Sequence, residues 1–310
     1  MSVTTLGISG PEISRLGIGG WQAGGTGDWG GGPTSDDDAV IAAIRHAVER
    51  GVTWADTAAS YGLGHSEEVV ARALEPWLVG EEVLVFTKCA HPWDPPLGLR
   101  TELKPATIRR ECEDSLRRLG VERIDLYQFH HPDPKTPIED SWGAMADLVR
   151  EGKVRWAGLS NTNAELLARC EPILHVDAAQ QELNLLRPSE LEALPTFVAN
   201  GTGVLAYSPL ATGLLSRPYD PERAPNLPKG ARVTEADRVA SAVGALEQVA
   251  SSRGVPIAAA AVAWVLAQPG VTGAICGART PEQVDGWIRS DELALDETEL
   301  AFLDASATER

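Results

Sequence analysis

The feature that most constrains the fold is an alternation of short apolar runs with stretches whose apolar residues recur at helical spacing. The alternation repeats about eight times along the 310 residues. It predicts a parallel sheet whose strands are joined by helices. Eight units in a chain of this length favour a closed (β/α)8 barrel over an open doubly wound sheet. We therefore expect an α/β protein in which residues 1–310 form a single barrel domain.

Apolar periodicity gives approximate bounds for these elements. The expected strands cover residues 52–55, 83–87, 124–130, 154–159, 176–180, 204–207 and 271–276. The expected helices cover residues 36–50, 66–75, 105–119, 138–150, 164–174, 189–200, 239–252, 257–267 and 281–288. The longest apolar run, 255–267, is shorter than the ~20 residues of a membrane-spanning helix, so it predicts a buried helix.

The N-terminal glycines argue against an open dinucleotide-binding sheet. Gly17, Gly19 and Gly20 lack the Gly-x-Gly-x-x-Gly spacing of that fold and lead into a Gly-rich loop. Two short segments within residues 3–17, around Ser9-Gly10-Pro11, predict a β-hairpin ahead of the barrel. Helices are expected to close the chain at its C-terminal end.

Charge and cysteine content exclude several classes of protein. A formal net charge of −17 opposes a broad nucleic-acid-binding surface, because phosphate contacts need clustered Lys and Arg. The four cysteines are far apart with no paired spacing, so neither a disulfide framework nor a zinc site is predicted. With no signal segment and no membrane span in the pattern, we expect a cytoplasmic protein. No feature indicates an oligomeric state.

Polar residues occupy the ends of the expected strands. In a barrel these ends meet on one face, where active sites lie. Asp56 follows the second strand, Lys88 ends the third and His130 the fourth, with Tyr61 in the second loop. Each has a structural explanation when taken alone, such as a turn cap, a surface lysine or a satisfied core histidine. Together they favour a catalytic site.

The chemistry that suits these four residues is proton donation to a carbonyl group. A free phenol has a pKa of about 10, too high for efficient acid catalysis near neutral pH. A neighbouring ammonium group such as Lys88 would lower that pKa by about 1–3 units, with Asp56 holding the lysine in place. His130 would donate a hydrogen bond to the carbonyl oxygen. Acid catalysis supplies no electrons, so a separate reductant is required.

With these residues in place, the sequence resembles the aldo-keto reductase family over essentially its whole length. The motifs that carry the resemblance are Asp56-Thr57-Ala58-x-x-Tyr61-Gly62-x-Gly64-x-Ser66-Glu67, Thr87-Lys88, Ile124-Asp125-Leu126-Tyr127-x-x-His130, Gly158-Leu159-Ser160-Asn161, Tyr207-Ser208-Pro209-Leu210 and Gly277-Ala278-Arg279-Thr280-Pro281-Glu282. The resemblance implies a hairpin-plugged barrel that binds NADPH without a Rossmann domain. It also implies that Asp56, Tyr61, Lys88 and His130 form the catalytic tetrad, with Tyr61 as general acid during reduction of an aldehyde or ketone.

The resemblance extends to cofactor contacts. Ser160, Asn161 and Gln180 match positions that hold the nicotinamide carboxamide, and Tyr207 matches the residue that stacks on the ring. The full implied cofactor set is Gly20, Trp21, Asp56, Ser160, Asn161, Gln180, Tyr207, Ser208, Pro209, Leu210, Gly213, Leu214, Gly277, Arg279 and Gln283. The Pro-rich segment 217–229 is expected to fold over the cofactor as a lid.

The last strand loop departs from the family pattern. Arg279 falls in the region that meets the adenosine 2′-phosphate and has the charge for it. However, Gln283 stands where many members have Arg, and Gly286 and Trp287 stand where they have a Glu-Asn pair. Because of Arg279, NADPH is the expected cofactor. The departures at Gln283, Gly286 and Trp287 leave NADH as an open alternative.

Aromatic residues near the expected pocket mouth suggest its substrate wall. Trp21 and Trp29 in the first loop, Trp93 after the third strand and His131 beside the catalytic histidine are the candidates. Aromatic walls suit flat or sugar-like carbonyl compounds, although packing under a loop explains each Trp equally well. Two other functions stay open: a nucleotide-binding, redox-sensing regulatory subunit, and a redox-neutral lyase or isomerase.

Overall fold

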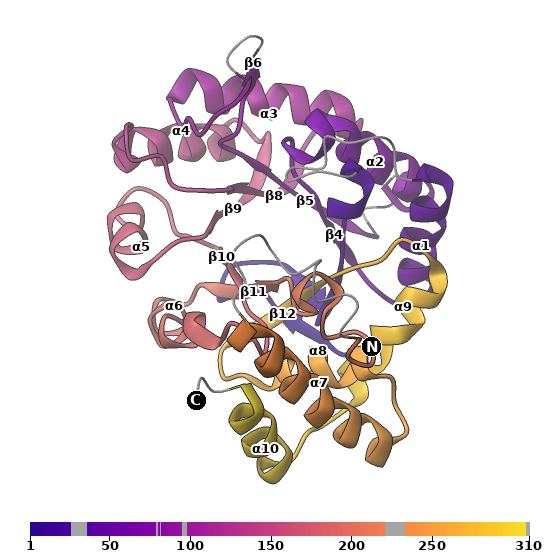
Figure 1. Cartoon of the computed structure of the whole chain (residues 1–310). Helices are drawn as coiled ribbons and strands as arrows, with labels where there is room; N and C mark the ends of the chain where they lie inside the picture. Colours follow the sequence, from indigo (N-terminus) through magenta and orange to yellow (C-terminus); the bar gives the residue numbers. More distant parts are fainter. Residues whose placement is uncertain (26–35, 79, 81, 95–97, 221–232, 308–310) are drawn as a thin grey trace.

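A computed structural model of the chain shows a closed eight-stranded parallel barrel surrounded by helices (Figure 1). It describes residues 1–25, 36–78, 80, 82–94, 98–220 and 233–307. The barrel strands are β3 (Leu16–Gly19), β4 (Trp54–Asp56), β5 (Leu84–Cys89), β8 (Ile124–Phe129), β9 (Val154–Ser160), β10 (Ala178–Glu182), β11 (Gly203–Tyr207) and β12 (Val271–Gly277). β12 pairs with β3 to close the barrel. This confirms the expected (β/α)8 fold.

Helices cover the outside of the barrel in the order expected from the alternation (Figure 1). They are α1 (Asp37–Glu49), α2 (His65–Leu78), α3 (Pro105–Leu119), α4 (Ile138–Arg150), α5 (Ala164–Cys170), α6 (Leu194–Asn200), α7 (Val233–Arg253), α8 (Ile257–Ala267), α9 (Pro281–Trp287) and α10 (Glu297–Ala307). Local chemistry sets several ends. The Asp36 side chain caps α1 by accepting a hydrogen bond from the Ala39 amide, and Gly120 ends α3 in the left-handed conformation.

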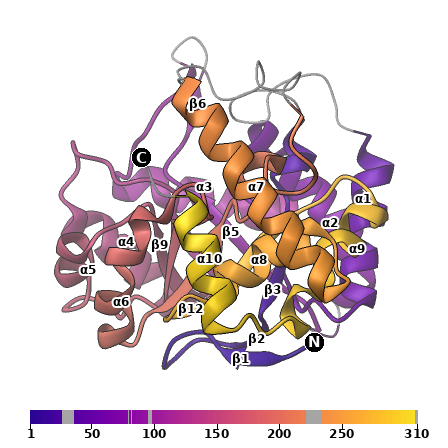
Figure 2. The same cartoon turned by 60° about the horizontal axis from the view of Figure 1, so that its bottom comes forward.

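The bottom of the barrel is closed by the expected N-terminal hairpin. Its strands β1 (Val3–Thr5) and β2 (Glu12–Ser14) pair antiparallel and lie beneath the barrel (Figure 2). Leu6 and Ile13 are fully buried and share a core cluster with Trp54 and other inward-facing strand residues. The hairpin therefore leaves the carboxyl ends of the strands as the open face.

The first barrel strand is the main difference from the sequence expectation. We expected Gly17 and Gly19 to lead into a loop because glycine disfavours strands, yet both lie in β3, which pairs with β4 and β12. The Trp54 side chain explains Gly17: a Cβ there would lie 2.4 Å from the indole ring. Glycine is therefore required where the strand passes this ring.

Several other boundaries moved. β5 continues one residue beyond Lys88, because Cys89 still pairs with Phe129 of β8, so Lys88 is not the last strand residue. The expected helix 189–200 is a 3-10 turn (Pro188–Glu192) followed by α6, and the helix expected at 164–174 ends at Cys170.

The Ala-rich segment forms α8, in which nine residues are buried, as expected of a core helix. In the described part of the chain, no single helix has both the length and the apolar character to cross a membrane; only the pair Ala236–Arg253 and Ile257–Ala267, bent by 99°, has them jointly.

Candidate active site

An ion pair lies inside the barrel at the open end. Lys88 on β5 donates a hydrogen bond to Asp56 at the end of β4, with Nζ 2.5 Å from Oδ1. The same Nζ lies 2.8 Å from the Thr57 carbonyl oxygen. Lys88 is 1% exposed and Asp56 is 4% exposed. Burial lowers the pKa of Lys88, while the adjacent Asp56 carboxylate opposes that shift.

The other oxygen of Asp56 is held by two amides. The Nε2 atom of Gln180 lies 2.9 Å from Oδ2, and that of Gln128 lies 3.3 Å away. Both glutamines are buried; Gln128 lies on β8 and Gln180 on β10, with β9 between these strands in the barrel. The sequence analysis did not identify Gln128, although a glutamine within the apolar run 124–130 was a signal for it. The carboxylate is thus fixed by donors on both sides.

A tight turn places Tyr61 above this pair. Gly62 has φ +60°, and a Cβ there would lie 2.7 Å from the carbonyl oxygen of Gly24. The turn therefore requires glycine directly after the tyrosine. The Tyr61 ring lies edge-on to the His130 ring, with 5.5 Å between centroids, and its centroid is 5.4 Å from Lys88 Nζ.

The protonation of the phenol differs from expectation. We expected Lys88 to lower the pKa of Tyr61, but burial and the negative charge of Asp56 raise it above its ordinary value. The ammonium charge of Lys88 is neutralised at 2.5 Å by Asp56, so little of it acts on the more distant phenol. At neutral pH Tyr61 therefore carries its proton.

His130 completes the group of four. It is 7% exposed, and its Nδ1 atom lies 3.4 Å from Ser60 Oγ. Burial, followed by the charge of Lys88, lowers the pKa of His130 well below its usual range. The imidazole is therefore neutral at neutral pH and has one N–H group to donate.

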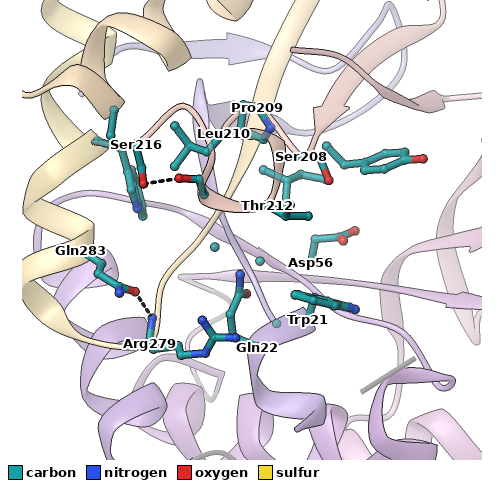
Figure 3. A pocket seen from close by; sticks show the side chains of 18 of the residues that line it. Trp21, Gln22, Asp56, Ser208, Pro209, Leu210, Thr212, Ser216, Arg279 and Gln283 are labelled. Atoms are coloured by element: carbon teal, nitrogen blue, oxygen red, sulfur yellow. Dashed lines mark hydrogen bonds between the residues drawn. The ribbon is translucent and has the colours of Figure 1, made fainter. Parts of the chain in front are cut away.

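A cavity of about 780 Å³ opens directly above these residues. Its walls bring together residues from six of the strand-end loops: Gly20, Trp21, Asp56, Tyr61, His130, His131, Ser160, Asn161, Gln180, Tyr207, Ser208, Pro209, Leu210, Gly213, Gly277, Arg279 and Gln283. Figure 3 shows Trp21 and Gln22 facing the segment that carries Ser208 to Thr212 across it. The structure thus brings residues that are up to 263 positions apart in the sequence around one cavity.

Three of the described residues named from the sequence do not line this cavity. Lys88 lies beneath its floor, behind Asp56. Leu214 is not part of its wall, and Trp93 lines a second cavity of about 390 Å³ instead. Trp29 lies outside the described residues, as does most of the expected lid at 217–229.

The cavity also has lining residues that the sequence analysis missed. They are Gly19, Gln22, Thr212, Ser216, Arg217, Ala258, Ile275 and Glu282, together with Gly286 and Trp287, which had been noted only as departures from the family pattern. Two buried atoms among them, Gln22 Oε1 and Trp287 Nε1, have no hydrogen-bond partner within the described structure. Unpaired buried polar atoms in a cavity wall are typical of a ligand site.

The Asn161 side chain connects neighbouring segments of the cavity rim. Asn161 Oδ1 accepts a hydrogen bond from the Tyr207 hydroxyl at 2.8 Å, and its Nδ2 donates to the His130 carbonyl at 2.8 Å. Beyond Tyr207, the backbone of Ser208, Ala211 and Thr212 has positive φ values of 54°, 47° and 54°. Such strained conformations outside glycine concentrate at functional sites.

At the far end of the cavity, opposite charges lie close in sequence. Arg279 and Glu282 are both exposed and both line the wall. The Arg279 backbone amide donates a hydrogen bond to Gln283 Oε1 at 2.7 Å, as Figure 3 shows. The Arg279 side chain gives this loop a positive charge at the cavity wall.

Comparison with known proteins agrees with this geometry. The model of the Aldo/keto reductase family matches residues 15–308. The chain is 35% identical to aldo-keto reductase YhdN of Bacillus subtilis over 94% of its own length and 91% of that protein. It is 33% identical to the NADH-specific methylglyoxal reductase of Escherichia coli, over 92% and 91% of the two chains.

A solved structure, that of the glycerol dehydrogenase AKR11B4 from Gluconobacter oxydans, superposes with a TM-score of 0.87 at 34% identity. The match covers 98% of this chain and 94% of that one. On the family match and these relatives, the chain belongs to the aldo/keto reductase family, the oxidoreductases that act on carbonyl groups with nicotinamide cofactors.

Proposed function

We propose that this protein reduces an aldehyde or ketone to the corresponding alcohol, with Tyr61 as the general acid. The observation that carries the proposal is the grouping of Tyr61 and His130 above the buried Lys88–Asp56 pair, at the floor of a cavity large enough for a nucleotide and a small substrate. The bound reduced nicotinamide supplies the hydride in this reaction.

A nicotinamide dinucleotide fits the chemistry of the cavity wall. Gln22 Oε1 accepts and Trp287 Nε1 donates, and both are unpaired within the described structure. Ser160, Asn161 and Gln180 offer amide and hydroxyl groups for the carboxamide. We assign the segment 208–214 to the pyrophosphate, because its backbone is forced into the tight turns that present amide groups.

The part of the cavity that we assign to the adenosine of the cofactor has features that suit either NADPH or NADH. Arg279 provides a guanidinium for the 2′-phosphate of NADPH, which supports NADPH. Glu282 lines the same wall with a carboxylate, the group that pairs with a free 2′-hydroxyl. NADH is therefore the alternative, and one relative is named as NADH-specific.

Each of the four side chains has a separate role in proton transfer to the carbonyl oxygen. Tyr61 holds its proton at neutral pH and releases it to the carbonyl oxygen as negative charge develops there. Lys88, 5.4 Å from the ring centroid and paired with Asp56, limits the repulsion between the Asp56 carboxylate and the phenolate that remains. His130 donates its N–H to the same oxygen without adding a positive charge to the resting site. Asp56 keeps Lys88 in position.

Trp21 and His131 are the substrate-side residues that line this cavity. Both have an apolar ring and a hydrogen-bonding nitrogen, which suits a small carbonyl compound with hydroxyl or further carbonyl groups. Trp93 is placed at the second cavity, so we do not assign it to the substrate.

Turnover tests the proposal. We expect oxidation of NADPH or NADH, followed at 340 nm, with members of a panel of aldehydes, ketones, quinones and sugars. Cofactor binding is measured separately by quenching of Trp fluorescence. Tight cofactor binding without turnover on any member would contradict the reductase proposal and favour a regulatory subunit; turnover of a substrate with no net cofactor oxidation would favour a lyase or isomerase.

A further inference from the structure

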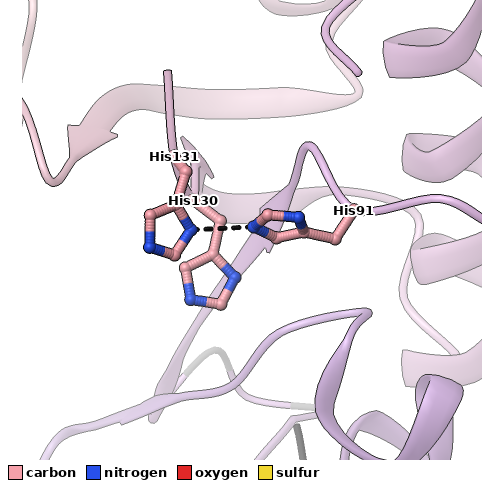
Figure 4. Close-up of side chains that lie close together, drawn as sticks. All are labelled: His91, His130 and His131. Carbon is pink, nitrogen blue, oxygen red and sulfur yellow. Dashed lines mark hydrogen bonds between the residues drawn. The ribbon is translucent and has the colours of Figure 1, made fainter. Parts of the chain in front are cut away.

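Three histidine rings converge beside the active site. His130 and His131 follow β8, and His91 follows β5, its neighbour in the barrel, so their loops meet (Figure 4). His91 Nε2 lies 2.8 Å from His131 Nδ1. One nitrogen from each of the three rings lies within 4.8 Å of the other two. Neither the sequence spacing nor the proposed reaction accounts for this three-ring cluster.

The spacing is close to that of a zinc site. Zn–N bonds of about 2.0–2.1 Å in a tetrahedral site place the ligand nitrogens about 3.3–3.4 Å apart. The His91–His131 pair is about 0.5 Å closer than this, and the three nitrogens all lie within 4.8 Å of one another, so the rings turn to take up the tetrahedral geometry when an ion binds. Three imidazoles with an open fourth position are a recurring zinc ligand set.

The outer nitrogen of His91 is held in place. His91 Nδ1 lies 3.5 Å from the Thr101 hydroxyl oxygen, and the ring also forms a hydrogen bond with the backbone of Arg100. Metal-binding histidines have such a partner on the nitrogen away from the ion, which fixes the orientation of the ring. The Nε2 atom of His91 is thereby directed at His131.

Metal ligation requires the neutral form of imidazole, and burial favours that form: His91 is 6% exposed and His130 is 7% exposed. The charge of Lys88 opposes a cation here, but Asp56 at 2.5 Å compensates most of it. Because His91 Nε2 and His131 Nδ1 form a hydrogen bond, the proton between them moves to the other nitrogen of its own ring when an ion binds.

An ion can reach the cluster from two sides. His130 and His131 line the main cavity, and His91 lines the second one. Glu111 lines that second cavity too, and its carboxyl group lies 3.1 Å from the Ala90 amide next to His91. A cation that enters from this side meets an acidic group before it reaches the imidazoles.

We propose that His91, His130 and His131 bind one Zn²⁺ ion, and that this ion inhibits carbonyl reduction by occupying His130. The inhibitory part rests on the proposed function, in which His130 must donate its N–H to the substrate. The ion competes with the carbonyl compound and leaves the dinucleotide region of the cavity unobstructed. Zinc therefore raises the KM for the carbonyl substrate and leaves cofactor affinity unchanged.

The first test is metal binding by the full chain without cofactor. Calorimetry with ZnCl2 is expected to show one Zn²⁺ per chain, and CoCl2 to give the visible absorption bands of four-coordinate Co²⁺. Loss of a mere hydrogen-bond partner of a ligand costs about 10–100-fold in metal affinity, so His91→Gln is expected to weaken Zn²⁺ binding by at least about tenfold. His131→Gln is the second variant, should the first fail to fold.

A matched control addresses surface binding. His46 lies 2.9 Å from Asp285 and offers zinc a histidine and a carboxylate outside the barrel. His46→Gln is expected to leave Zn²⁺ affinity and the Co²⁺ spectrum unchanged. No Zn²⁺ binding by the wild-type chain, equal affinity in the His91→Gln variant, or loss of binding in His46→Gln would overturn the proposed site.

The second test measures inhibition. His91→Gln is expected to keep wild-type turnover in chelated buffer and to lose Zn²⁺ inhibition, while EDTA restores activity to the zinc-treated wild type. Inhibition that persists in the variant would contradict the proposal. Metal binding does not depend on turnover, so zinc binding through His91 in a chain that reduces no carbonyl compound would contradict the proposed function alone.

Discussion

Removal of one charge from the buried Lys88–Asp56 pair is expected to cost more stability than removal of both. In Asp56→Asn, the new amide has one oxygen to offer, but Lys88 on one side and Gln180 and Gln128 on the other all present donors. One donor set is therefore left facing an NH2 group. Since breaking a buried pair from one side costs about 3–5 kcal/mol, we expect a loss of about 3 kcal/mol in the free energy of unfolding at pH 7.

The difference in stability between Asp56→Asn and the wild type should become smaller as the pH rises. Without Asp56, only the Glu67 charge opposes the effect of burial on Lys88, and the folded-state pKa moves further below the unfolded value of about 10.4. Between those two pKa values the unfolded chain binds more protons than the native one, so stability rises with pH, by at most about 1.4 kcal/mol per pH unit. Asp56→Asn should therefore approach the wild type between pH 7 and pH 10.

Urea unfolding followed by Trp fluorescence and circular dichroism measures these energies. The double variant Asp56→Asn/Lys88→Met removes both charges, and we expect it to be more stable at pH 7 than Asp56→Asn alone. An Asp56→Asn deficit below about 1 kcal/mol, or a deficit that does not change with pH, would refute the assignment of a charged, buried lysine.

Three further predictions concern the cofactor, pH and the tyrosine turn. Arg279→Ala should weaken NADPH binding about five- to tenfold and leave NADH unchanged, because a charged hydrogen bond contributes about 1.5–3 kcal/mol before solvent screening; an unchanged affinity ratio, read by fluorescence titration, would remove Arg279 from the 2′-phosphate site. Burial raises the pKa of Glu111 to about 7, so the native chain holds the extra proton and wild-type stability falls as pH rises from about 4.5 to 7. Between pH 5 and pH 8, the free energy of unfolding of Glu111→Gln should rise by up to about 3 kcal/mol relative to that of the wild type. Urea unfolding that shows the same pH dependence for both proteins would contradict this prediction. Gly62→Ala should cost about 1–3 kcal/mol and lower kcat, since its Cβ meets the Gly24 carbonyl. Gly143→Ala, where a Cβ meets nothing within 4 Å in α4, is the control: it should leave kcat unchanged and raise stability by about 0.5–1 kcal/mol.

The fold was predictable because it rests on a repeated local pattern. Each strand and helix shows its own periodicity, and eight repeats leave few alternatives to a barrel. The exception was β3, whose glycines have low strand propensity. Its pairing with β4 and β12 overrides that propensity, and the bulk of Trp54 explains why Gly17 is there.

The candidate site was predictable where one residue type at a strand end sufficed. Asp56, Tyr61 and His130 lie together as their places in the order of strands implied. The protonation of Tyr61 was not predictable, because it depends on how closely Lys88 is paired with Asp56 and on burial. His91 was missed for a related reason: its partners are contributed by another loop, and no sequence spacing records that contact.

The central claim is that Tyr61 supplies the proton for carbonyl reduction. The measurement that tests it most directly is the turnover of Tyr61→Phe, with cofactor affinity determined on the same preparation. Phenylalanine preserves the ring beside His130 and removes the hydroxyl group, so we predict a fall in kcat of about 10²–10⁴-fold with the cofactor Kd within about twofold of wild type. A Tyr61→Phe enzyme that turns over within about tenfold of the wild type would contradict the account.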